Sequence, residues 1–301
     1  MSSCIVLGGS GFIGRRVCQH LVQNGFKVKS ISRHPFKTQN DSIQFHPMDL
    51  SKPSAKNIAN LLDKNVKGII NLIGIMYEDK SRGITFQRLH EELPKELSVV
   101  AKENDLHLVH VSAIGANSNS DIPYLRSKGH GERYCSDSGC KYTILRPSLV
   151  FGPEDTFFNR FAMLLNFLPV LPVFNGGKSL FQPAYVDDIA EAIVKIVGNA
   201  NEYNGKIFEL AGPDVLTYRQ MMEKIVAYTG KTRPIVSMPN SIANLQAFFM
   251  EMLPVNPLTI TRDQIKMLGM NNVASENMPG FKELKITPKY IDEIVPQYLN
   301  K

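Results

Sequence analysis

Glycines near the start of the chain have the spacing of a phosphate-binding loop. The stretch Gly8-Gly9-Ser10-Gly11-Phe12-Ile13-Gly14 lies between an apolar, β-branched run and a helical pattern, which is the context in which such a loop binds a dinucleotide. Gly8 can supply the tight turn, Gly11 leaves room for a pyrophosphate, and Gly14 lets the helix pack close to the sheet. The first N–H groups of the helix then face the phosphates. A merely structural turn is the alternative. The expected binding residues are Gly8, Ser10, Gly11, Phe12, Ile13 and Gly14.

The end of the second expected strand indicates which dinucleotide binds. A chain that binds NAD usually carries an acidic residue there, which holds the 2′-hydroxyl of the ribose. Ser32 takes that position here, and Arg33 follows it. A guanidinium beside the ribose suits a 2′-phosphate, and one charge-assisted contact contributes roughly 1.5–3 kcal/mol. We therefore expect NADP(H) rather than NAD(H), the alternative being that Arg33 is an ordinary surface arginine.

The elements that must position these residues alternate between short apolar runs and helical patterns. Strands buried on both faces read as nearly continuous apolar runs, and strands that alternate with helices form parallel sheets. The sequence therefore predicts an α/β fold, a Rossmann-type doubly wound parallel sheet with a small α-rich C-terminal lobe. The expected strands are residues 4–7, 27–31, 44–45, 68–73, 108–112 and 142–145.

Prolines divide the second half of the chain into short helices and loops. Helices are expected at residues 186–197 and 218–228, the second after Thr217 as a plausible N-cap. We expect an NADP(H)-binding domain in residues 1–152. Residues 153–301 are expected to form a smaller lobe, interleaved with that domain, which completes the sheet and holds a partner or substrate.

Composition excludes several classes of protein. The 301 residues are 43% hydrophobic, and the net charge of +6 comes from the N-terminal half, which fits a polyanionic ligand or an acidic partner. The absence of long basic runs argues against nucleic-acid binding, and no apolar stretch is long enough for a transmembrane segment.

Cysteine usage and the start of the chain indicate a cytoplasmic location. Four cysteines argue against a disulfide scaffold and fit a reducing compartment. The first expected strand leaves no room for a targeting segment. Cys135 and Cys140 lack a second pair of ligands, so no metal site is expected.

With these motifs the chain resembles the short-chain dehydrogenase/reductase superfamily, in particular its extended and atypical branches. Tyr124-Leu125-Arg126-Ser127-Lys128 matches the Tyr-x-x-x-Lys pair. The resemblance implies that Asp49 and Leu50 face the adenine, that Ile73 and Gly74 line the cofactor, and that Pro147 lies beside the nicotinamide. It also implies that Lys128 holds the nicotinamide ribose, while Tyr124 is the general acid and base.

A third catalytic group departs from the pattern of this superfamily. Its members position the substrate carbonyl with a hydroxyl at the end of the fifth strand, about two residues after the first serine. Here Ser112 is that serine, and Ile114 stands where the hydroxyl is expected. Ser112 itself is expected to lie too deep. The resemblance therefore implies an incomplete Ser-Tyr-Lys triad, and whether the protein is an enzyme stays open.

Longer stretches resemble the family of dehydrogenase-like accessory subunits of respiratory complex I and their bacterial relatives. They are residues 71–78, 110–117, 127–132 and 151–162, with further agreement at 258–268 and 296–299. The resemblance implies a non-catalytic accessory or assembly subunit that holds NADPH. Its partners would be complex I subunits at the inner face of the cytoplasmic membrane. The alternatives are an NADPH-dependent reductase or nucleotide-sugar epimerase/dehydratase that uses Tyr124 and Lys128, and a redox sensor that signals by a change of shape.

Two apolar stripes in the second half bear on the question of partners. Residues 161–174 form the first stripe. Lobe core is the first interpretation of both stripes, and docking on a membrane protein or the bilayer surface is the alternative. The second stripe, within residues 241–253, consists of Ile242, Leu245, Phe248, Phe249, Met252 and Leu253 at helical spacing.

Overall fold

The computed structural model describes residues 1–35, 40–239, 241–243, 247 and 261–299. The chain divides into two compact units, each of which is described by itself. The first unit contains residues 1–147, 186–210 and 276–287. The second contains residues 148–185, 211–275 and 288–301.

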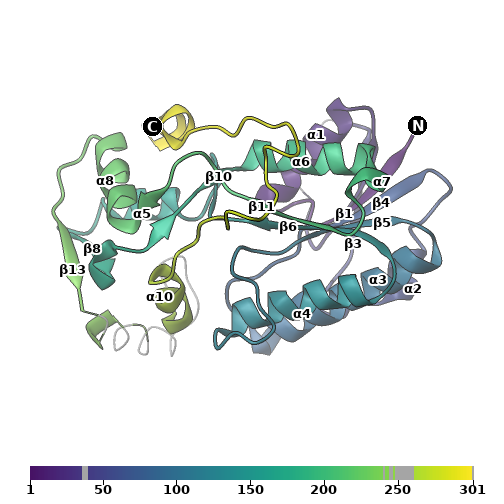
Figure 1. The fold of residues 1–301 in the computed structure, drawn as a ribbon, viewed down its shortest axis with the longest axis horizontal. Helices are drawn as coiled ribbons and strands as arrows, with labels where there is room; N and C mark the ends of the chain where they lie inside the picture. The colour runs from purple at the N-terminus through teal and green to yellow at the C-terminus, as the bar shows by residue number, and fades with distance from the viewer. Residues whose placement is uncertain (36–39, 240, 244–246, 248–260, 300–301) are drawn as a thin grey trace. The chain divides into compact units, whose positions relative to one another are not determined.

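Seven parallel strands form the sheet of the first unit, in the order β11-β6-β5-β4-β1-β2-β3 (Figure 1). The order reverses beside β1, which lies between β2 and β4, and ligands of such sheets bind at the carboxyl ends of the strands where this happens. The doubly wound α/β fold is therefore confirmed. The strands are β1 (Ser3–Leu7), β2 (Lys27–Ser32), β3 (Ile43–Pro47), β4 (Val66–Asn71), β5 (His107–Val111), β6 (Lys141–Pro147) and β11 (Lys206–Leu210).

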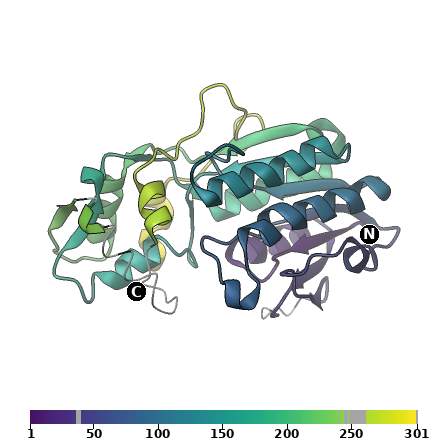
Figure 2. The same ribbon diagram turned by 90° about the horizontal axis from the view of Figure 1, so that it is seen from below.

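Helices cover both faces of this sheet. Helices α1 (Phe12–Gln23) and α6 (Val186–Gly198) lie on one face, and α3 (Leu93–Glu103) and α4 (Pro123–Asp137) lie on the other, which Figure 2 views from their side. Helix α1 turns its buried residues Gly14, Val17, Cys18 and Leu21 inward at helical spacing. The shorter pieces are α2 (Ala55–Ala59), η1 (Lys80–Arg82), the π-helical turn η2 (Gln87–Glu92) and α7 (Ala200–Tyr203).

The division into units differs from the expected boundary after residue 152. Strand β11 pairs with β6, with Ile207 opposite Ile144, so it completes the sheet of the first unit. Helix α6 packs against α1 and carries an almost wholly apolar buried face. Residues 186–210 therefore lie in the first unit although they follow the chain's first passage into the second. The sequence had indicated interleaving but had not identified β11.

The second unit is built from short helices and two-stranded pairs around an aromatic core. Its centre is Tyr218, which is fully buried and lies within about 6.5 Å of the ring centres of Phe157, Phe161, Phe174 and Phe181. Its elements are β7 (Val150–Phe151), α5 (Phe158–Leu164), β8 (Leu171–Phe174), η3 (Asn175–Gly177), β9 (Leu180–Phe181), β10 (Ala184–Tyr185), β12 (Leu216–Thr217), α8 (Tyr218–Tyr228), β13 (Ile235–Met238), α10 (Arg262–Leu268), α11 (Ile291–Ile294) and α12 (Pro296–Leu299).

Local chemistry explains where α8 begins. The Thr217 hydroxyl accepts a hydrogen bond from the backbone N–H of Gln220, and the Gln220 side chain accepts one from the backbone N–H of Thr217. This reciprocal pair satisfies two donors that the first turn of a helix leaves free. The expected N-cap is therefore present.

The two apolar stripes have different outcomes. In the stripe of residues 161–174, the side chains Phe161, Leu165, Leu171, Val173 and Phe174 are buried and belong to the core of the second unit. Three others are exposed, Phe167 most of all, with 76% of its surface exposed, then Val170 with 39% and Met163 with 37%. Most of the second stripe, Leu245, Phe248, Phe249, Met252 and Leu253, lies outside the described residues, and Ile242 is exposed. Within the described ranges, no helix combines the length and apolar character that crossing a bilayer requires.

The contact of α4 with η2 gives a first testable prediction. A Cβ atom on Gly131 would lie 2.2 Å from the backbone oxygen of His90. Relieving this overlap requires a backbone shift, so Gly131→Ala is expected to destabilise the protein by roughly 1–3 kcal/mol. Urea unfolding followed by circular dichroism measures the effect.

Gly198→Ala is the matched control, because Gly198 also lies in a helix and a Cβ there would meet nothing within 4 Å. Alanine at this position should be neutral or should stabilise by roughly 0.5–1 kcal/mol. Equal unfolding midpoints for the two variants would contradict the close packing of α4 on η2.

Candidate functional site

The glycine-rich loop lies between β1 and α1, as expected. Gly8 has a φ of +83°, a conformation that favours glycine, and Gly11 precedes the helix as its N-cap. A Cβ atom on Gly14 would lie 2.0 Å from the backbone oxygen of Gly8, so only glycine permits this approach of helix to strand. The first helical hydrogen bond runs from the backbone N–H of Arg15 to Gly11. The earlier N–H groups precede that ladder and can bind an anion.

Gly9 is a loop residue that the sequence reasoning did not single out. A Cβ atom there would lie 2.2 Å from Oγ of Ser30 on β2. The loop therefore packs on the second strand through Gly9 and on its own helix through Gly14. The spacing of the glycines in the sequence does not show which of them packs on the strand and which on the helix.

The ends of β2 and β3 bring Arg33 into the neighbourhood of Asp49. The Ser32 hydroxyl is buried and donates to the backbone oxygen of His34, whereas Arg33 is exposed. Hydrogen bonds from Ser51, with a smaller contribution from the Arg33 charge, lower the pKa of Asp49 below its ordinary value. A guanidinium and a carboxylate therefore lie at this edge of the sheet. Leu50 is 4% exposed and belongs to the apolar core.

The segment after β4 connects the glycine loop with α4. The Cδ1 atom of Ile73 lies 3.2 Å from where a Cβ on Gly8 would be, so Ile73 packs on the glycine loop. A Cβ on Gly74 would lie 3.3 Å from Nζ of Lys128. The fold therefore brings the expected residues Gly8, Ile73, Gly74 and Lys128 into one continuous site.

Lys128 is a buried cation at the centre of this site. Its side chain is 3% exposed, and Nζ donates to the backbone oxygen of Val111 over 3.1 Å. Burial lowers the pKa of Lys128 to about 8, against a weaker opposing effect from Glu132. The Glu132 carboxylate is itself bound by the guanidinium of Arg146, at 2.6 and 2.9 Å.

Tyr124 lies one turn before Lys128 on α4, and its ring contacts the rings of Phe86 and His90 edge-on. Burial raises the pKa of Tyr124 to about 12. A nearby ammonium would have the opposite effect on a tyrosine. The direction of this shift is opposite to the one that proton transfer at neutral pH needs.

The end of β5 carries the remaining expected residues. The Ser112 hydroxyl is buried and has no hydrogen-bond partner within the described part of the chain. Ile114 is also buried, and its backbone N–H donates to the backbone oxygen of Pro147 at the end of β6. An unpartnered buried hydroxyl is consistent with a site that gains hydrogen bonds from a ligand.

Two buried histidines beside Lys128 were missed by the sequence reasoning. His90 and His110 are at most 1% exposed, and burial beside Lys128 lowers the pKa of His90 to about 2 and of His110 to about 3. Asn71 holds Nδ1 of His110 at 3.1 Å. The signal that the sequence contains for His110 is a polar residue inside an otherwise apolar strand.

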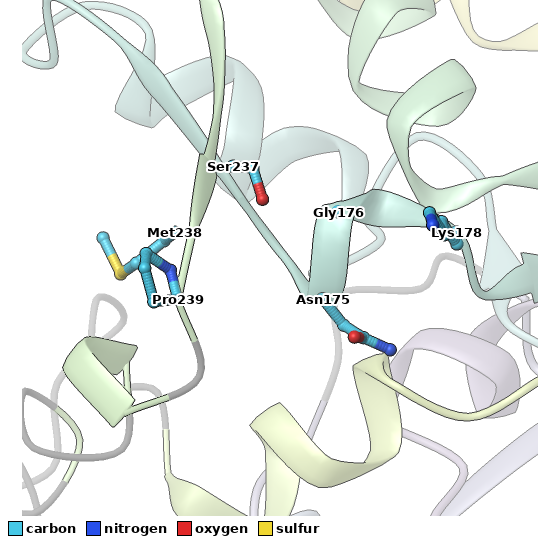
Figure 3. A pocket seen from close by; sticks show the side chains of 6 residues that line it. All are labelled: Asn175, Gly176, Lys178, Ser237, Met238 and Pro239. Atoms are coloured by element: carbon cyan, nitrogen blue, oxygen red, sulfur yellow. The ribbon is translucent and has the colours of Figure 1, made fainter.

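The lining of a hollow in the second unit contains none of the expected site residues. The hollow has a volume of about 320 Å³ and lies between the end of β13 and the turn η3 (Figure 3). The side chains of Asn175, Lys178 and Ser237 supply polar groups to its lining. Its lining residues are Asn175, Gly176, Lys178, Ser237, Met238 and Pro239.

The cysteines are buried structural groups. Burial raises the pKa of Cys135, and Cys140 is also buried, its Sγ atom lying close to the backbone oxygen of Cys135. Among the residues that the structure describes, no three metal-binding side chains gather at one place.

Comparisons with known proteins extend these observations. Residues 4–211 match the model of the NAD dependent epimerase/dehydratase family. The NADH dehydrogenase [ubiquinone] 1 alpha subcomplex subunit 9, mitochondrial, of Arabidopsis thaliana is 31% identical over 299 residues, which cover 94% of this chain and 73% of that protein. The protein of the same description from Rattus norvegicus is 28% identical over 291 residues, covering 94% and 76%.

A solved structure supports the same fold. The dTDP-glucose 4,6-dehydratase of Bacillus anthracis, in complex with NAD, superposes with a TM-score of 0.72 at 16% identity, covering 99% of this chain and 96% of that one. At this identity the likeness concerns the fold alone, and the sequence relatives carry the classification. The chain belongs to the NAD dependent epimerase/dehydratase family, and within the extended short-chain dehydrogenases/reductases it is a relative of the complex I alpha subcomplex subunit 9 proteins.

Proposed function

We propose that the protein binds NADP(H) as an accessory or assembly subunit of respiratory complex I and does not turn the cofactor over. The observation that carries this proposal is the geometry around Lys128. Its amine is buried beside Gly74 and donates to the Val111 carbonyl. No hydroxyl stands at position 114, where a catalytic one is expected.

The residues of the first unit fit a phosphorylated dinucleotide. The loop of Gly8, Gly11 and Gly14 offers backbone N–H groups where side chains would fill the space. The first turn of α1 contains no acidic residue that would repel phosphates. Arg33 is exposed at the edge where the adenosine ribose binds in this fold, and would contact a 2′-phosphate.

Further contacts would come from residues on the neighbouring strands. Ser32 and Asp49 would contact the ribose and adenine, with Leu50 supporting them from the core. Ile73, Gly74 and Lys128 would line the path to the nicotinamide, and Pro147 would lie beside it. The bound group would supply a hydride donor, and the chain's own residues would bind and orient it.

The complex I relatives support the proposed partner. Their similarity extends over more than nine-tenths of this chain, so it includes the second unit as well as the sheet. We infer that the protein is peripheral to the membrane in which the respiratory complex lies. In a bacterium, this would be the cytoplasmic face of that membrane.

An NADPH-dependent reductase or nucleotide-sugar epimerase/dehydratase is the second candidate function. It is favoured by the presence of Tyr124 and Lys128 on one helix at the Tyr-x-x-x-Lys spacing. Such an enzyme needs a tyrosine that exchanges protons near neutral pH, and burial raises the pKa of Tyr124 to about 12. Turnover of NADPH with a carbonyl compound or a sugar nucleotide would favour it over the accessory role.

Arg33→Ala tests the cofactor assignment. Loss of one charge-assisted contact should weaken NADPH binding by about 10- to 150-fold, while NADH binding should stay within about twofold. Isothermal titration with both cofactors measures this. Arg16→Ala is the control, since Arg16 contacts Asp187 of α6 at 3.4 Å. Unchanged NADPH affinity in Arg33→Ala would contradict the assignment.

Lys128→Met should have opposite effects on folding and on binding. Because burial lowers the pKa of Lys128 from 10.5 to about 8, removing the charge should stabilise the ligand-free protein near pH 7, by up to about 3 kcal/mol. The same change should weaken NADPH binding by about tenfold or more, because Lys128 would no longer donate to the ribose. Thermal unfolding and cofactor titration measure the two effects.

The pH dependence of unfolding checks the cause. The unfolded chain binds more protons than the folded one between pH 8 and 10.5, so the unfolding free energy of the ligand-free protein should rise across this window. The rise should be smaller in Lys128→Met but unchanged in Lys141→Met, where the partly exposed lysine contacts Asp105. Equal pH profiles for the wild type and Lys128→Met would exclude a buried, destabilised ammonium.

Association with the respiratory complex is tested directly. A tagged chain purified from mildly solubilised membranes should carry complex I subunits and about one NADPH per chain, both identified by mass spectrometry. Incubation with carbonyl compounds should leave that NADPH unoxidised. Recovery of the chain without complex I subunits, or steady turnover of a defined metabolite, would overturn the proposal.

A further inference from the structure

His90 has no place in the proposed binding of NADP(H), yet it connects two parts of that site. The side chain is fully buried in the π-helical turn η2, a type of turn that is often found at functional sites. Its Nε2 atom accepts a hydrogen bond from the backbone N–H of Ile75, at 3.0 Å. Its Nδ1 atom lies 2.9 Å from the hydroxyl of Ser127 on α4. One imidazole therefore joins the segment after β4 to the helix that carries Lys128.

The donors and acceptors around the ring fix its tautomer. A backbone N–H can only donate, so Nε2 of His90 carries no proton, and the neutral ring carries its proton on Nδ1. Nδ1 then donates to the Ser127 hydroxyl, which in turn donates to the backbone oxygen of Tyr124 at 2.8 Å. Burial beside Lys128 and His110 keeps the ring neutral by lowering the pKa of His90. The result is a hydrogen-bonded chain with one direction, from Ile75 to Tyr124.

Packing holds the ring in place. The His90 ring stacks on Phe86 with centres 5.3 Å apart and meets the Tyr124 ring edge-on at 5.6 Å. The backbone of His90 lies so close to Gly131 that a single Cβ would overlap it. The imidazole therefore has little freedom to move away from its two hydrogen-bond partners.

The segment that His90 holds is the one that contacts Lys128. Gly74 precedes Ile75, and a Cβ on Gly74 would lie 3.3 Å from Nζ of Lys128 and 4.0 Å from Nε2 of His90. Displacement of this segment would change the space beside the buried ammonium. Arg33 follows β2 and lies outside this segment, so its place beside the adenosine ribose would be kept.

We propose that His90 is a positioning residue that joins the segment after β4 to α4 and thereby orients Lys128 toward the nicotinamide half of the cofactor. This inference rests on the proposed binding of NADP(H). A role in packing alone would affect the stability of the whole unit and both halves of the cofactor site alike, so the two roles can be separated.

The test uses two probes of different length. NADPH occupies the whole site, whereas 2′,5′-ADP carries the adenosine and the 2′-phosphate but no nicotinamide. In His90→Leu, which loses both hydrogen bonds, the Kd of NADPH should rise about tenfold or more, while that of 2′,5′-ADP should change less than about twofold. In His90→Gln, whose amide can accept from Ile75 and donate to Ser127, NADPH binding should return to within about threefold of the wild type.

His107 provides the matched control. It is also a buried histidine that contacts a hydroxyl, since its Nε2 lies 2.8 Å from the Thr143 hydroxyl. It lies at the amino end of β5, whereas the candidate site lies at the carboxyl end. His107→Leu should lower the unfolding midpoint and leave the affinity for both probes unchanged. If His90→Leu does not fold, Ser127→Ala removes the Nδ1 partner and should weaken NADPH binding several-fold without affecting 2′,5′-ADP.

Each outcome decides the matter. Equal weakening of both probes in His90→Leu, or in Ser127→Ala where that variant is used, would show a structural role and overturn the inference. Unchanged NADPH binding would overturn it as well, as would failure of His90→Gln to restore binding. A wild-type protein that binds 2′,5′-ADP and NADPH with equal affinity would refute the positioning role alone, and one that binds neither would refute the proposed function itself.

Discussion

The site depends on the close approach between the first turn of α1 and the end of β1. The helix can lie there only because Gly14 has no side chain, since a Cβ would overlap the backbone oxygen of Gly8. Gly9 imposes the same condition on the side of β2. With these contacts made, the free N–H groups at the start of α1 and the carboxyl ends of β1, β2 and β4 share one edge of the sheet. A dinucleotide site in this fold requires that edge, because it is where the strand order reverses.

A second constraint acts at the other end of the site, where the Lys128 cation is buried. Glu132, whose charge acts on Lys128, is bound by Arg146, and both neighbouring histidines are kept neutral by burial. The Lys128 ammonium donates a hydrogen bond to the backbone oxygen of Val111. Desolvation of an ammonium without an ion partner opposes folding. A ligand with acceptor oxygens would offset that unfavourable free energy, so folding and binding of the cofactor are coupled by mass action.

Much of the sheet was predictable, because buried parallel strands have a distinctive composition. The apolar runs of β1, β4 and β5 and the glycine pattern after β1 are signals within one stretch of chain. Strand β11 was not predicted, because it is separated from β6 by a passage through the second unit. Its parallel pairing with β6, in which Phe208 lies opposite Leu145, reveals it in the structure. Sequence spacing cannot show that a distant segment completes a sheet.

The candidate site was predictable to the extent that it follows from spacing along one element. Tyr124 and Lys128 share a helix, and the loop glycines share a turn, so both groups were found. His90 was not, because its role comes from contacts with Ile75 and Ser127, which lie 15 and 37 residues away. A histidine on the buried side of a helix resembles a packing residue until its hydrogen-bond partners are known.

Tyr124 and Lys128 would need different properties for binding a cofactor than for turning it over. Proton transfer at neutral pH needs a tyrosine whose pKa falls toward the working pH, and a nearby ammonium is the usual cause. Here burial raises the pKa of Tyr124, while the Lys128 amine is engaged with a backbone carbonyl. The unpartnered Ser112 hydroxyl and the buried ammonium can still gain hydrogen bonds from a sugar. Contacts that stabilise a bound cofactor and a transition state equally produce affinity without accelerating a reaction. Such contacts are what the proposed accessory role requires, since it needs a tightly held dinucleotide and no turnover.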